Sequence, residues 1–446
     1  VATQSLRFEP TGFLELTKTS SPADTNNKIK TLSMWVKRAK LSTSQVLFSV
    51  SDGSNEYYSF YFDTNNNLGF LASQSRANVI STNVFRDVSA WYHITLVIDT
   101  TQATNTNRIK LFVNNSDNLI SPSSSIFPSQ NITTIAYIAP PSGTHYPTIG
   151  DFKNNSSNQL SAYLSEVNMI DGQALDASYF GETKNGVWIP KKYSGSYGTN
   201  GFRLQFKQTG TGTASSSTIG ADTSGNTHHF TSSGIVASDC NMPDSPENNF
   251  ATWNPLRPNA SMSYSEGNLN AISSGGGGRS GYGTIGMSTG KWYFETLGGD
   301  NSVGIADTSG ITYATYSASG SYNLNGTTVS SKSTYTTSDI ISVAYDADGG
   351  NIEFFKNGSS EGSSSFTDGQ GFDLVAQFNG KSGVSRTCTA NFGQDSSFAG
   401  TKTAQGNTDA KGIGDFYYAP PSGYLALCTS NLPEPTISPN ADTQAD

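Results

Sequence analysis

Two short stretches decide the fold: Ile94–Asp99, which reads ITLVID, and Ile109–Asn114, which reads IKLFVN. Both contain β-branched or aromatic residues, and a polar residue ends each of them, as is typical of β-strands. The spacer between them, Thr100–Arg108, is almost entirely polar and turn-forming. The pattern therefore predicts an antiparallel pair of strands joined by a long loop.

The same arrangement recurs in the second half of the chain. Ile340–Tyr345 reads IISVAY, the turn-forming segment Asp346–Gly350 follows, and Asn351–Gly358 reads NIEFFKNG. Glycine supplies the positive φ that a tight turn between strands requires. We therefore expect two β units of similar construction, one in each half of the chain.

The composition points to the same fold class. The chain has 446 residues, enough for two or three domains, with 35% hydrophobic and 14% charged residues and 45 glycines. Its 24 Phe, 21 Tyr and 5 Trp provide large side chains for a core, so the chain is not of the disordered class. These numbers exclude helix bundles and coiled coils, and they predict an all-β protein.

Charge and cysteine content exclude several functions. A formal net charge of −9 argues against nucleic acid as a partner, because binding it requires a basic surface. No apolar run approaches the roughly 18 residues of a membrane helix, and Val1–Glu9 lacks the apolar core of a signal peptide. Cys240, Cys388 and Cys428 do not have the spacing of a disulfide scaffold or a zinc site, so we expect isolated buried thiols.

Other segments lack strand periodicity. Gln208–Gly234 is rich in Gly, Ser and Thr, and Met242–Pro258 contains four prolines, which favour an extended connector. We expect proteases to cut first in Gln208–Gly234 or in the glycine run Ser273–Gly278, leaving a stable C-terminal fragment from about Ser261. The one helical candidate is a single turn at Asp176–Gly181, with an aspartate N-cap and a glycine after its end.

Several segments of the first half resemble a laminin G-like, concanavalin A-like sandwich. They are Ser5–Phe8, Leu32–Arg38, Ala90–Ile94, Ile109–Asn114 and Leu164–Val167. Segments of the second half resemble a SPRY domain, which is also a two-sheet jelly roll: Gly290–Glu295, Val303–Ala306, Asp339–Asp346 and Phe354–Gly358.

The two resemblances imply two antiparallel jelly-roll β-sandwich domains in series. The expected boundaries are residues 1–236 for the laminin G-like domain and 237–260 for a proline-rich extended connector. Residues 261–432 form the SPRY-like domain, and 433–446 form a polar, proline-rich tail.

The order of the two modules resembles that of structural proteins from marine tailed bacteriophages, as do three further segments: Asp222–Asn226, Asn248–Leu256 and Asn431–Thr436. This resemblance implies a protein on the surface of the phage particle, a tail fibre or another fibre that recognises host glycans without catalysis. In such proteins the chain often continues beyond the position of Asp446.

The implied partners are a host surface glycan, other virion proteins and further copies of this chain. A single sugar site binds at only about millimolar strength, near 4 kcal/mol, so we expect a homo-oligomer, most simply a trimer. Two alternatives stay open. The first is a purely structural role, as a capsid decoration or fibre shaft without a ligand, and the second is a glycan depolymerase.

Three enzyme motifs occur in contexts that do not support their chemistry. Gly286–Gly290 matches the nucleophile elbow G-x-S-x-G, but a strand pattern follows it, and no histidine occurs after His229. Gly281–Gly286 matches G-x-G-x-x-G without a helix to receive a phosphate, and Gly380-Lys381-Ser382 lacks the first glycine of a P-loop. We therefore expect no catalytic residues and no enzyme activity.

We also expect no metal site and no cofactor. His228 and His229 are adjacent and would point apart on a strand, and Asp346–Gly349 lacks the later acidic residue of a calcium loop. The laminin G-like resemblance leaves open a lone structural calcium ion on the first domain.

The best ligand-binding candidates are Tyr313, Tyr316, Tyr322 and Asn323, in a loop of tyrosines and small residues. Tyrosine rings stack on the apolar face of a sugar, and asparagine satisfies hydroxyl groups. The alternative is that two of these tyrosines complete a strand. Trp35, Trp91 and Trp292 lie inside strand patterns and are expected in the core.

Overall fold

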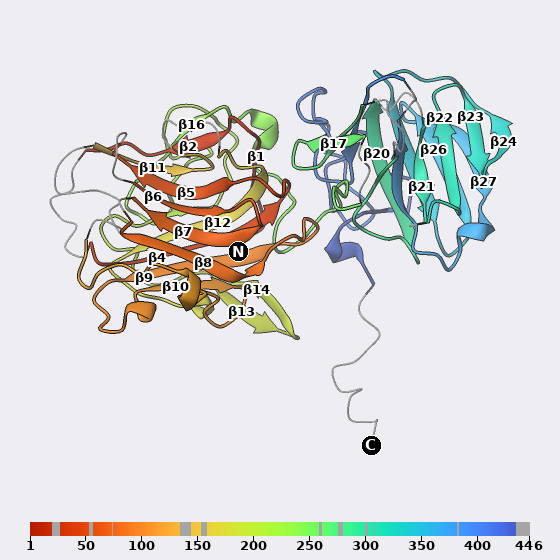
Figure 1. The fold of residues 1–446 in the computed structure, drawn as a ribbon. Helices are drawn as coiled ribbons and strands as arrows, with labels where there is room; N and C mark the ends of the chain where they lie inside the picture. Colours follow the sequence, from red (N-terminus) through yellow and green to blue (C-terminus); the bar gives the residue numbers. More distant parts are fainter. Residues whose placement is uncertain are drawn as a thin grey trace. The chain divides into compact units, whose positions relative to one another are not determined.

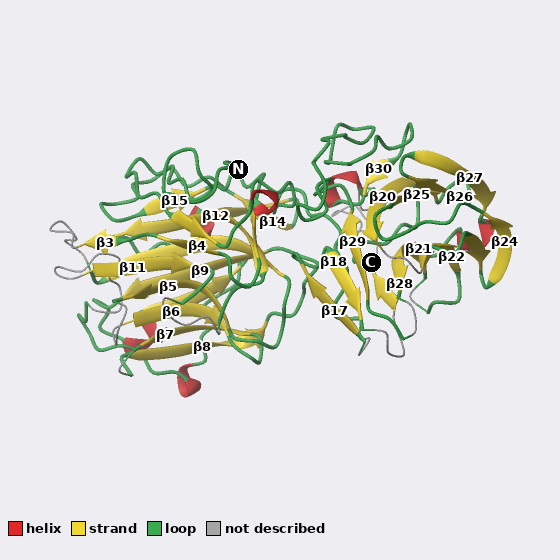
Figure 2. Ribbon diagram, turned by 90° about the horizontal axis from the view of Figure 1, so that it is seen from above, coloured by secondary structure: helices red, strands yellow, loops and turns green. Residues whose placement is uncertain are grey.

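The computed structural model divides the chain into two compact units, Val1–Glu247 and Asn248–Asp446. Both consist of β-sheets, and the part of the chain that is described contains no α-helix, as the sequence predicted (Figure 2). No helix in that part is long and apolar enough to span a membrane. The structure describes residues 1–19, 27–52, 57–73, 75–133, 144–152, 158–257, 261–274, 280–298, 302–307, 309–380 and 383–433.

The first unit contains two large antiparallel sheets (Figure 1). One has the strand order β1 (Leu6–Phe8), β12 (Ala162–Asp171), β4 (Ile29–Arg38), β9 (Tyr92–Asp99) and β10 (Ile109–Val113), with β15 (Phe202–Leu204) also paired to β12. The other has the order β16 (Thr231–Ser233), β2 (Phe13–Glu15), β11 (Thr144–Ile149), β5 (Gln45–Ser51), β6 (Tyr57–Phe62), β7 (Asn67–Ala72) and β8 (Ala77–Val84), with β3 (Lys18–Thr19) also paired to β11.

The predicted pairing of Ile94–Asp99 with Ile109–Asn114 is confirmed, because β9 and β10 are antiparallel neighbours. Side chains of β4 alternate between the two faces of the sheet, and this alternation determines which of them enter the core. Leu32, Met34 and Val36 point inward and are buried in the main hydrophobic cluster, which side chains from both sheets form. Burial of this apolar surface is the main force that holds the two sheets together.

Part of the outer face of the β4–β9 sheet is also covered. The hairpin of β13 (Gly181–Lys184) and β14 (Val187–Pro190) brings Trp188 onto His93, and its indole Nε1–H donates to His93 Nδ1 at 3.2 Å. His93 Nε2 therefore carries the ring proton and donates to Ser33 Oγ at 2.8 Å. The ring of Trp35 stacks on His93, so the prediction that Trp35 is buried is confirmed.

The second unit also has two sheets. The larger has the order β17 (Met262–Ser265), β18 (Asn270–Ser273), β29 (Arg386–Asn391), β20 (Lys291–Gly298), β25 (Ile340–Asp346), β26 (Asn351–Lys356) and β27 (Ser359–Ser365), with β30 (Leu425–Ala426) parallel to β20. The smaller has the order β19 (Ser280–Tyr282), β28 (Val375–Asn379), β21 (Ser302–Ala306), β22 (Tyr313–Ser317), β23 (Ser321–Leu324) and β24 (Thr327–Ser331). The predicted hairpin around Asp346–Gly350 is the β25–β26 pair.

The helical content consists of single 3-10 turns. They are η1 (Asn105–Asn107), η2 (Pro122–Ser124), η3 (Ala177–Tyr179), η4 (Ala237–Asp239), η5 (Thr367–Gly369) and η6 (Thr429–Asn431). The turn predicted at Asp176–Gly181 is η3, and the Asp176 carboxylate accepts from the backbone N–H of Ser178 at 2.9 Å.

Residues 237–260, expected as a connector, are divided between the two units. Asp239 pairs with the buried Arg7 at 3.0 Å, and Asp244 pairs with the buried Lys37 at 2.7 Å, so this end belongs to the first unit. Phe250 and Trp253 are buried in hydrophobic clusters of the second unit. Buried charges need partners, and the apolar side chains need a core, so the prolines do not keep this segment apart from either unit. The predicted tail lies outside the described residues from 434 onward.

Gln208–Gly234, expected to be an accessible linker, is instead an integral part of the first unit. Ile219 and Phe230 are buried in its main core, and β16 pairs with β2. Asp222 organises the intervening loop, because its carboxylate accepts from the N–H groups of Arg203 at 2.8 Å and His228 at 2.8 Å. A few apolar anchors and one carboxylate therefore order a segment whose composition indicated flexibility.

Candidate functional site

The outward face of the smaller sheet of the second unit carries a row of polar side chains. Cross-strand pairing aligns Tyr282 with Gln377, Gln377 with Gly304, Gly304 with Thr315, and Thr315 with Asn323. Because side chains alternate along a strand, aligned positions share one face of the sheet. The row therefore runs across five strands, β19, β28, β21, β22 and β23.

This face forms a depression of about 600 Å³. Gly304 contributes no side chain in the middle of the row, between Gln377 and Thr315. None of the described residues that line the depression carries a formal charge. They are Ser280, Tyr282, Ser302, Ser309, Gly310, Tyr313, Thr315, Asn323, Gly326, Gln377 and Asn379.

Gln377 is the most unusual of these side chains. Only 5% of its surface is exposed, and its Oε1 has no hydrogen-bond partner among the described residues. A buried polar atom without a partner destabilises a folded protein by about 1–3 kcal/mol, so proteins retain few of them. Each such group calls for an explanation, and a ligand that completes the site would provide one for Gln377.

Neighbouring side chains hold the depression in shape. Asn379 accepts from Ser280 Oγ at 2.5 Å and donates to Ser302 Oγ at 3.2 Å, which links three adjacent strands. The guanidinium of Arg257 lies 3.3 Å from the ring centroid of Tyr282 and fixes that ring by a cation–π contact. The site is therefore largely preformed.

One carboxylate organises the loop that forms the rim. Asp307 accepts hydrogen bonds from Ser309 Oγ at 2.8 Å and from the N–H groups of Gly310 at 2.5 Å and Thr312 at 2.9 Å. Burial alone would raise the pKa of Asp307, but the hydrogen bonds from Ser309 and Thr312 hold it well below its ordinary value. Ile311, the most exposed large apolar residue of the described chain, projects from this loop.

The structure separates the four predicted ligand-binding residues. Tyr313 and Asn323 line the depression. Tyr316 and Tyr322 are 0% exposed and pack on Phe354 in the core, so their prediction as ligand contacts is wrong. The alternative, that two of the tyrosines complete strands, is the correct one for this pair.

Sequence reasoning missed Gln377, Asn379, Thr315 and Tyr282. The signal for two of them was the alternation of Val375–Asn379, in which Ala376 and Phe378 are apolar while Gln377 and Asn379 are polar. That pattern places both polar residues on the outer face. It does not indicate which other strands align with them.

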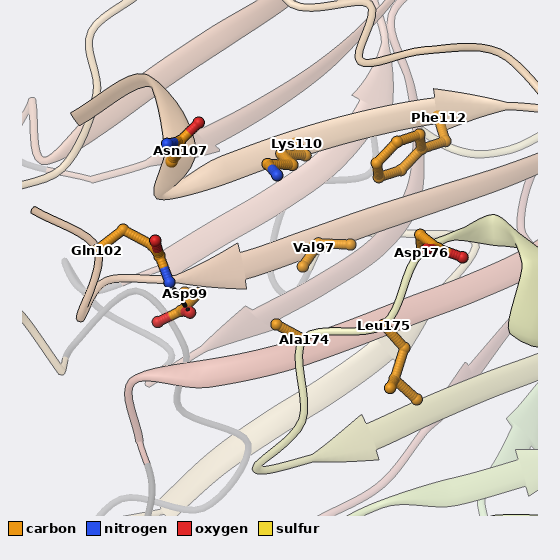
Figure 3. Close-up of a pocket in the computed structure, with 9 residues that line it drawn as sticks. All are labelled: Val97, Asp99, Gln102, Asn107, Lys110, Phe112, Ala174, Leu175 and Asp176. Carbon is orange, nitrogen blue, oxygen red and sulfur yellow. Dashed lines mark hydrogen bonds between the residues drawn. The ribbon is translucent and has the colours of Figure 1, made fainter. Parts of the chain in front are cut away.

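A second, smaller depression of about 230 Å³ lies on the outer face of β9 and β10 in the first unit (Figure 3). Lys110 and Phe112 project from β10 beside Val97, opposite the loop at Ala174–Asp176. Its two carboxylates have local structural partners. Asp99 accepts from Gln102 Nε2 at 2.6 Å and from Thr101 Oγ1 at 2.6 Å, and Asp176 caps η3.

The apparent enzyme motifs lie in the local structural contexts that the sequence indicated. β20 follows Gly286–Gly290, as predicted, and the described residues place no helix after Gly281–Gly286.

His229 Nδ1 accepts from the backbone N–H of Asp222 at 3.0 Å, and His228 Nδ1 lies 3.1 Å from the carbonyl oxygen of Gly201. Among the described residues, no group of three or more His, Cys, Asp or Glu side chains lies close enough together to hold a metal ion. Lys381 and Ser382 lie outside those residues.

The Asp346–Gly349 segment is a hairpin turn. Asp346 accepts from the backbone N–H of Gly349 at 2.8 Å and pairs with Lys291 at 2.9 Å, so its carboxylate already has partners.

Trp292 is buried as predicted, whereas Trp91 is only half-buried and donates from Nε1 to Asp244 at 3.2 Å.

Residues 15–178 match a laminin G family model described as the concanavalin A-like lectin/glucanases superfamily. This match confirms the concanavalin A-like resemblance of the first half of the chain. No curated protein matches the sequence.

Solved structures with a detectable likeness include SPRY domains and a pentraxin. The SPRY domain of human HERC1 has 20% identity, covering 32% of this chain and 97% of that one, with a TM-score of 0.27. The TRIM65 PSpry domain has 16% identity, 32% and 88% coverage, and a TM-score of 0.26. A SAP-like pentraxin from Limulus polyphemus has 17% identity, 39% and 77% coverage, and a TM-score of 0.28.

Proposed function

We propose that the chain is a non-catalytic carbohydrate-binding protein of a tailed-phage virion, a tail fibre or other fibre that attaches the particle to a host surface glycan. The resemblance to marine phage structural proteins supports the virion setting. The concanavalin A-like match of the first unit supports a carbohydrate-binding type of fold. Adhesion is the activity that the polar depression of the second unit serves best.

The depression itself is the observation that carries this proposal. Tyr282 and Tyr313 offer aromatic surface, and Asn323, Asn379 and Gln377 offer amide groups. Sugars are recognised by this combination of aromatic faces and hydrogen-bonding groups. Glycoside hydrolysis needs two carboxylates beside one bond, and the described residues that line the depression include no acidic side chain.

A fibre that holds a particle on its host multiplies weak sites. At about millimolar strength per site, several copies presented together raise the overall affinity by orders of magnitude. We therefore propose a homo-oligomer, most simply a trimer, which joins other virion proteins. Sedimentation of the full chain as a monomer at every concentration would place the source of avidity elsewhere in the particle.

The direct test is binding of the purified full chain to polysaccharide extracted from host cells, by affinity electrophoresis, with reducing-end release measured in parallel. Adhesion predicts retardation without release of reducing ends. Release of reducing ends would identify a depolymerase. Neither retardation nor release would favour a purely structural decoration or shaft.

A further inference from the structure

We propose that the depression of the second unit selects an uncharged glycan chain lying across β19, β28, β21, β22 and β23, and that Gln377 Oε1 accepts a hydrogen bond from it. The donor is a hydroxyl O–H or an acetamido N–H of the glycan. This inference rests on the proposed function and specifies its ligand and its central contact.

The charge of the site indicates an uncharged ligand. None of the described lining residues is ionic, so none of them offers a cation to the carboxylate of a uronic acid or to a sulfate group. Two ionic groups of the described chain that contact lining residues are already engaged. Asp307 is held by its own loop, and Arg257 stacks on Tyr282. An acidic sugar would lose hydration here without gaining an ion pair.

Gln377 supplies the specific contact. The residue is only 5% exposed, it lines the depression, and its Oε1 has no partner among the described residues. A glycan donor at this point would satisfy an acceptor that the described protein groups leave without a partner. Sites built on buried polar groups discriminate strongly against ligands that lack the matching group.

The length of the row indicates a chain rather than a single sugar. Neighbouring strands are about 4.8 Å apart, so the four intervals from Tyr282 to Asn323 span about 19 Å. Gly304, without a side chain, lies in the middle of this span. The row is longer than one sugar ring, and its polar side chains recur at each strand except there.

Gln377→Met tests the inference in the full chain, because methionine keeps the length of the side chain and removes both polar atoms. We expect a higher melting temperature, since an unpaired buried acceptor is lost. We also expect at least a tenfold weaker retention by neutral polysaccharides, with dextran, mannan and laminarin as probes. Gln405→Met is the matched control and should change neither quantity, because Gln405 is exposed and its loop packs through Phe398 on the larger sheet.

Each contrary outcome has a distinct meaning. Retention of Gln377→Met equal to that of the unmodified chain would overturn the role of Gln377 while leaving adhesion intact. A lower melting temperature together with lost binding would show that Gln377 is structural. Stronger retention by alginate or carrageenan, which are acidic, would overturn the preference for uncharged chains. Failure of the unmodified chain to bind any polysaccharide, including the host extract, would overturn both this inference and the proposed function.

Discussion

Glu295 is a buried carboxylate whose hydrogen bonds join a long loop to a sheet. It accepts from the backbone N–H groups of Tyr417 and Tyr418, both at 2.8 Å, and from Asn391 Nδ2 at 3.0 Å. Burial raises the pKa of Glu295 to about 7, although the hydrogen bonds from Tyr418 and Tyr417 oppose this shift. The stability of the second unit therefore depends on whether the Glu295 carboxyl is protonated.

The sign of this linkage is a prediction. With a folded-state pKa of about 7 against an ordinary 4.5, the folded chain binds more protons than the unfolded chain between those values. The unfolding free energy of the second unit should fall by about 3 kcal/mol as pH rises from 4.5 to 7. Urea titrations at several pH values measure it, and Glu295→Gln should remove this component. An equal pH dependence in both proteins would contradict the assignment.

The three cysteines give a second prediction. All are free and buried, as expected from the sequence, and burial raises the pKa of Cys428 to about 11 and that of Cys240 to about 12. The reactive species is the thiolate, so a disulfide reagent at pH 8 should modify no thiol of the native chain within minutes. In denaturant it should modify all three. Rapid modification of the native chain would show that one of these sites opens.

Residue spacing explains which parts of the site the sequence could predict. Tyr313 and Tyr316 are an odd number of positions apart on one strand, so they must face opposite sides, and only Tyr313 reaches the depression. Asn323 was predicted from the same loop. Gln377 is 54 positions beyond it in the chain, and only the pairing of β28 with β21 brings the two into one row. Local patterns do not specify such non-local register.

Among the elements, the β13–β14 hairpin controls the environment of His93. Burial lowers the pKa of His93 to about 3. Trp188 and the surrounding side chains exclude the water that would otherwise stabilise the charged imidazolium. Gly181 makes this possible, since a Cβ at that position would lie 2.4 Å from the indole of Trp188. The hairpin thus covers the outer face of the sheet at His93.

Removal of the Trp188 indole should change the pKa of His93 measurably. Trp188→Ala should raise the pKa of His93 by more than one unit toward its ordinary value of 6.5, as seen by NMR titration of the imidazole. It should also destabilise the first unit by about 2 kcal/mol. Trp188→Phe, which keeps a ring over His93 but lacks the N–H, is the control and should shift the pKa less. An unchanged His93 pKa in Trp188→Ala would show that the indole does not exclude water from the imidazole.

Strands were easier to predict than the segments between them. The pairs β9–β10 and β25–β26 are close in sequence, and their alternation and turn residues are local signals. Gln208–Gly234 was predicted to be a linker because it is rich in Gly, Ser and Thr. Its order depends on Ile219 and Phe230 reaching a core built by distant strands, which composition does not reveal.

At the scale of the whole molecule, the boundary between the units is testable. A chain ending at residue 236, the boundary expected from the sequence, lacks Asp239 and Asp244 and leaves Arg7 and Lys37 buried without these partners. Removing one partner of a buried ion pair costs about 3–5 kcal/mol. Residues 1–247 should therefore melt cooperatively, while residues 1–236 should melt far lower or not fold. Equal melting temperatures by circular dichroism would contradict this boundary.

Hydrogen–deuterium exchange of the full chain, with and without the neutral polysaccharide that it retains most strongly, tests glycan adhesion through the second unit most directly. Slower exchange on binding should be confined to peptides that contain β19, β21, β22, β23 and β28, together with the loop that Asp307 organises. Protection located only in the first unit, or no protection despite saturating polysaccharide, would contradict the account.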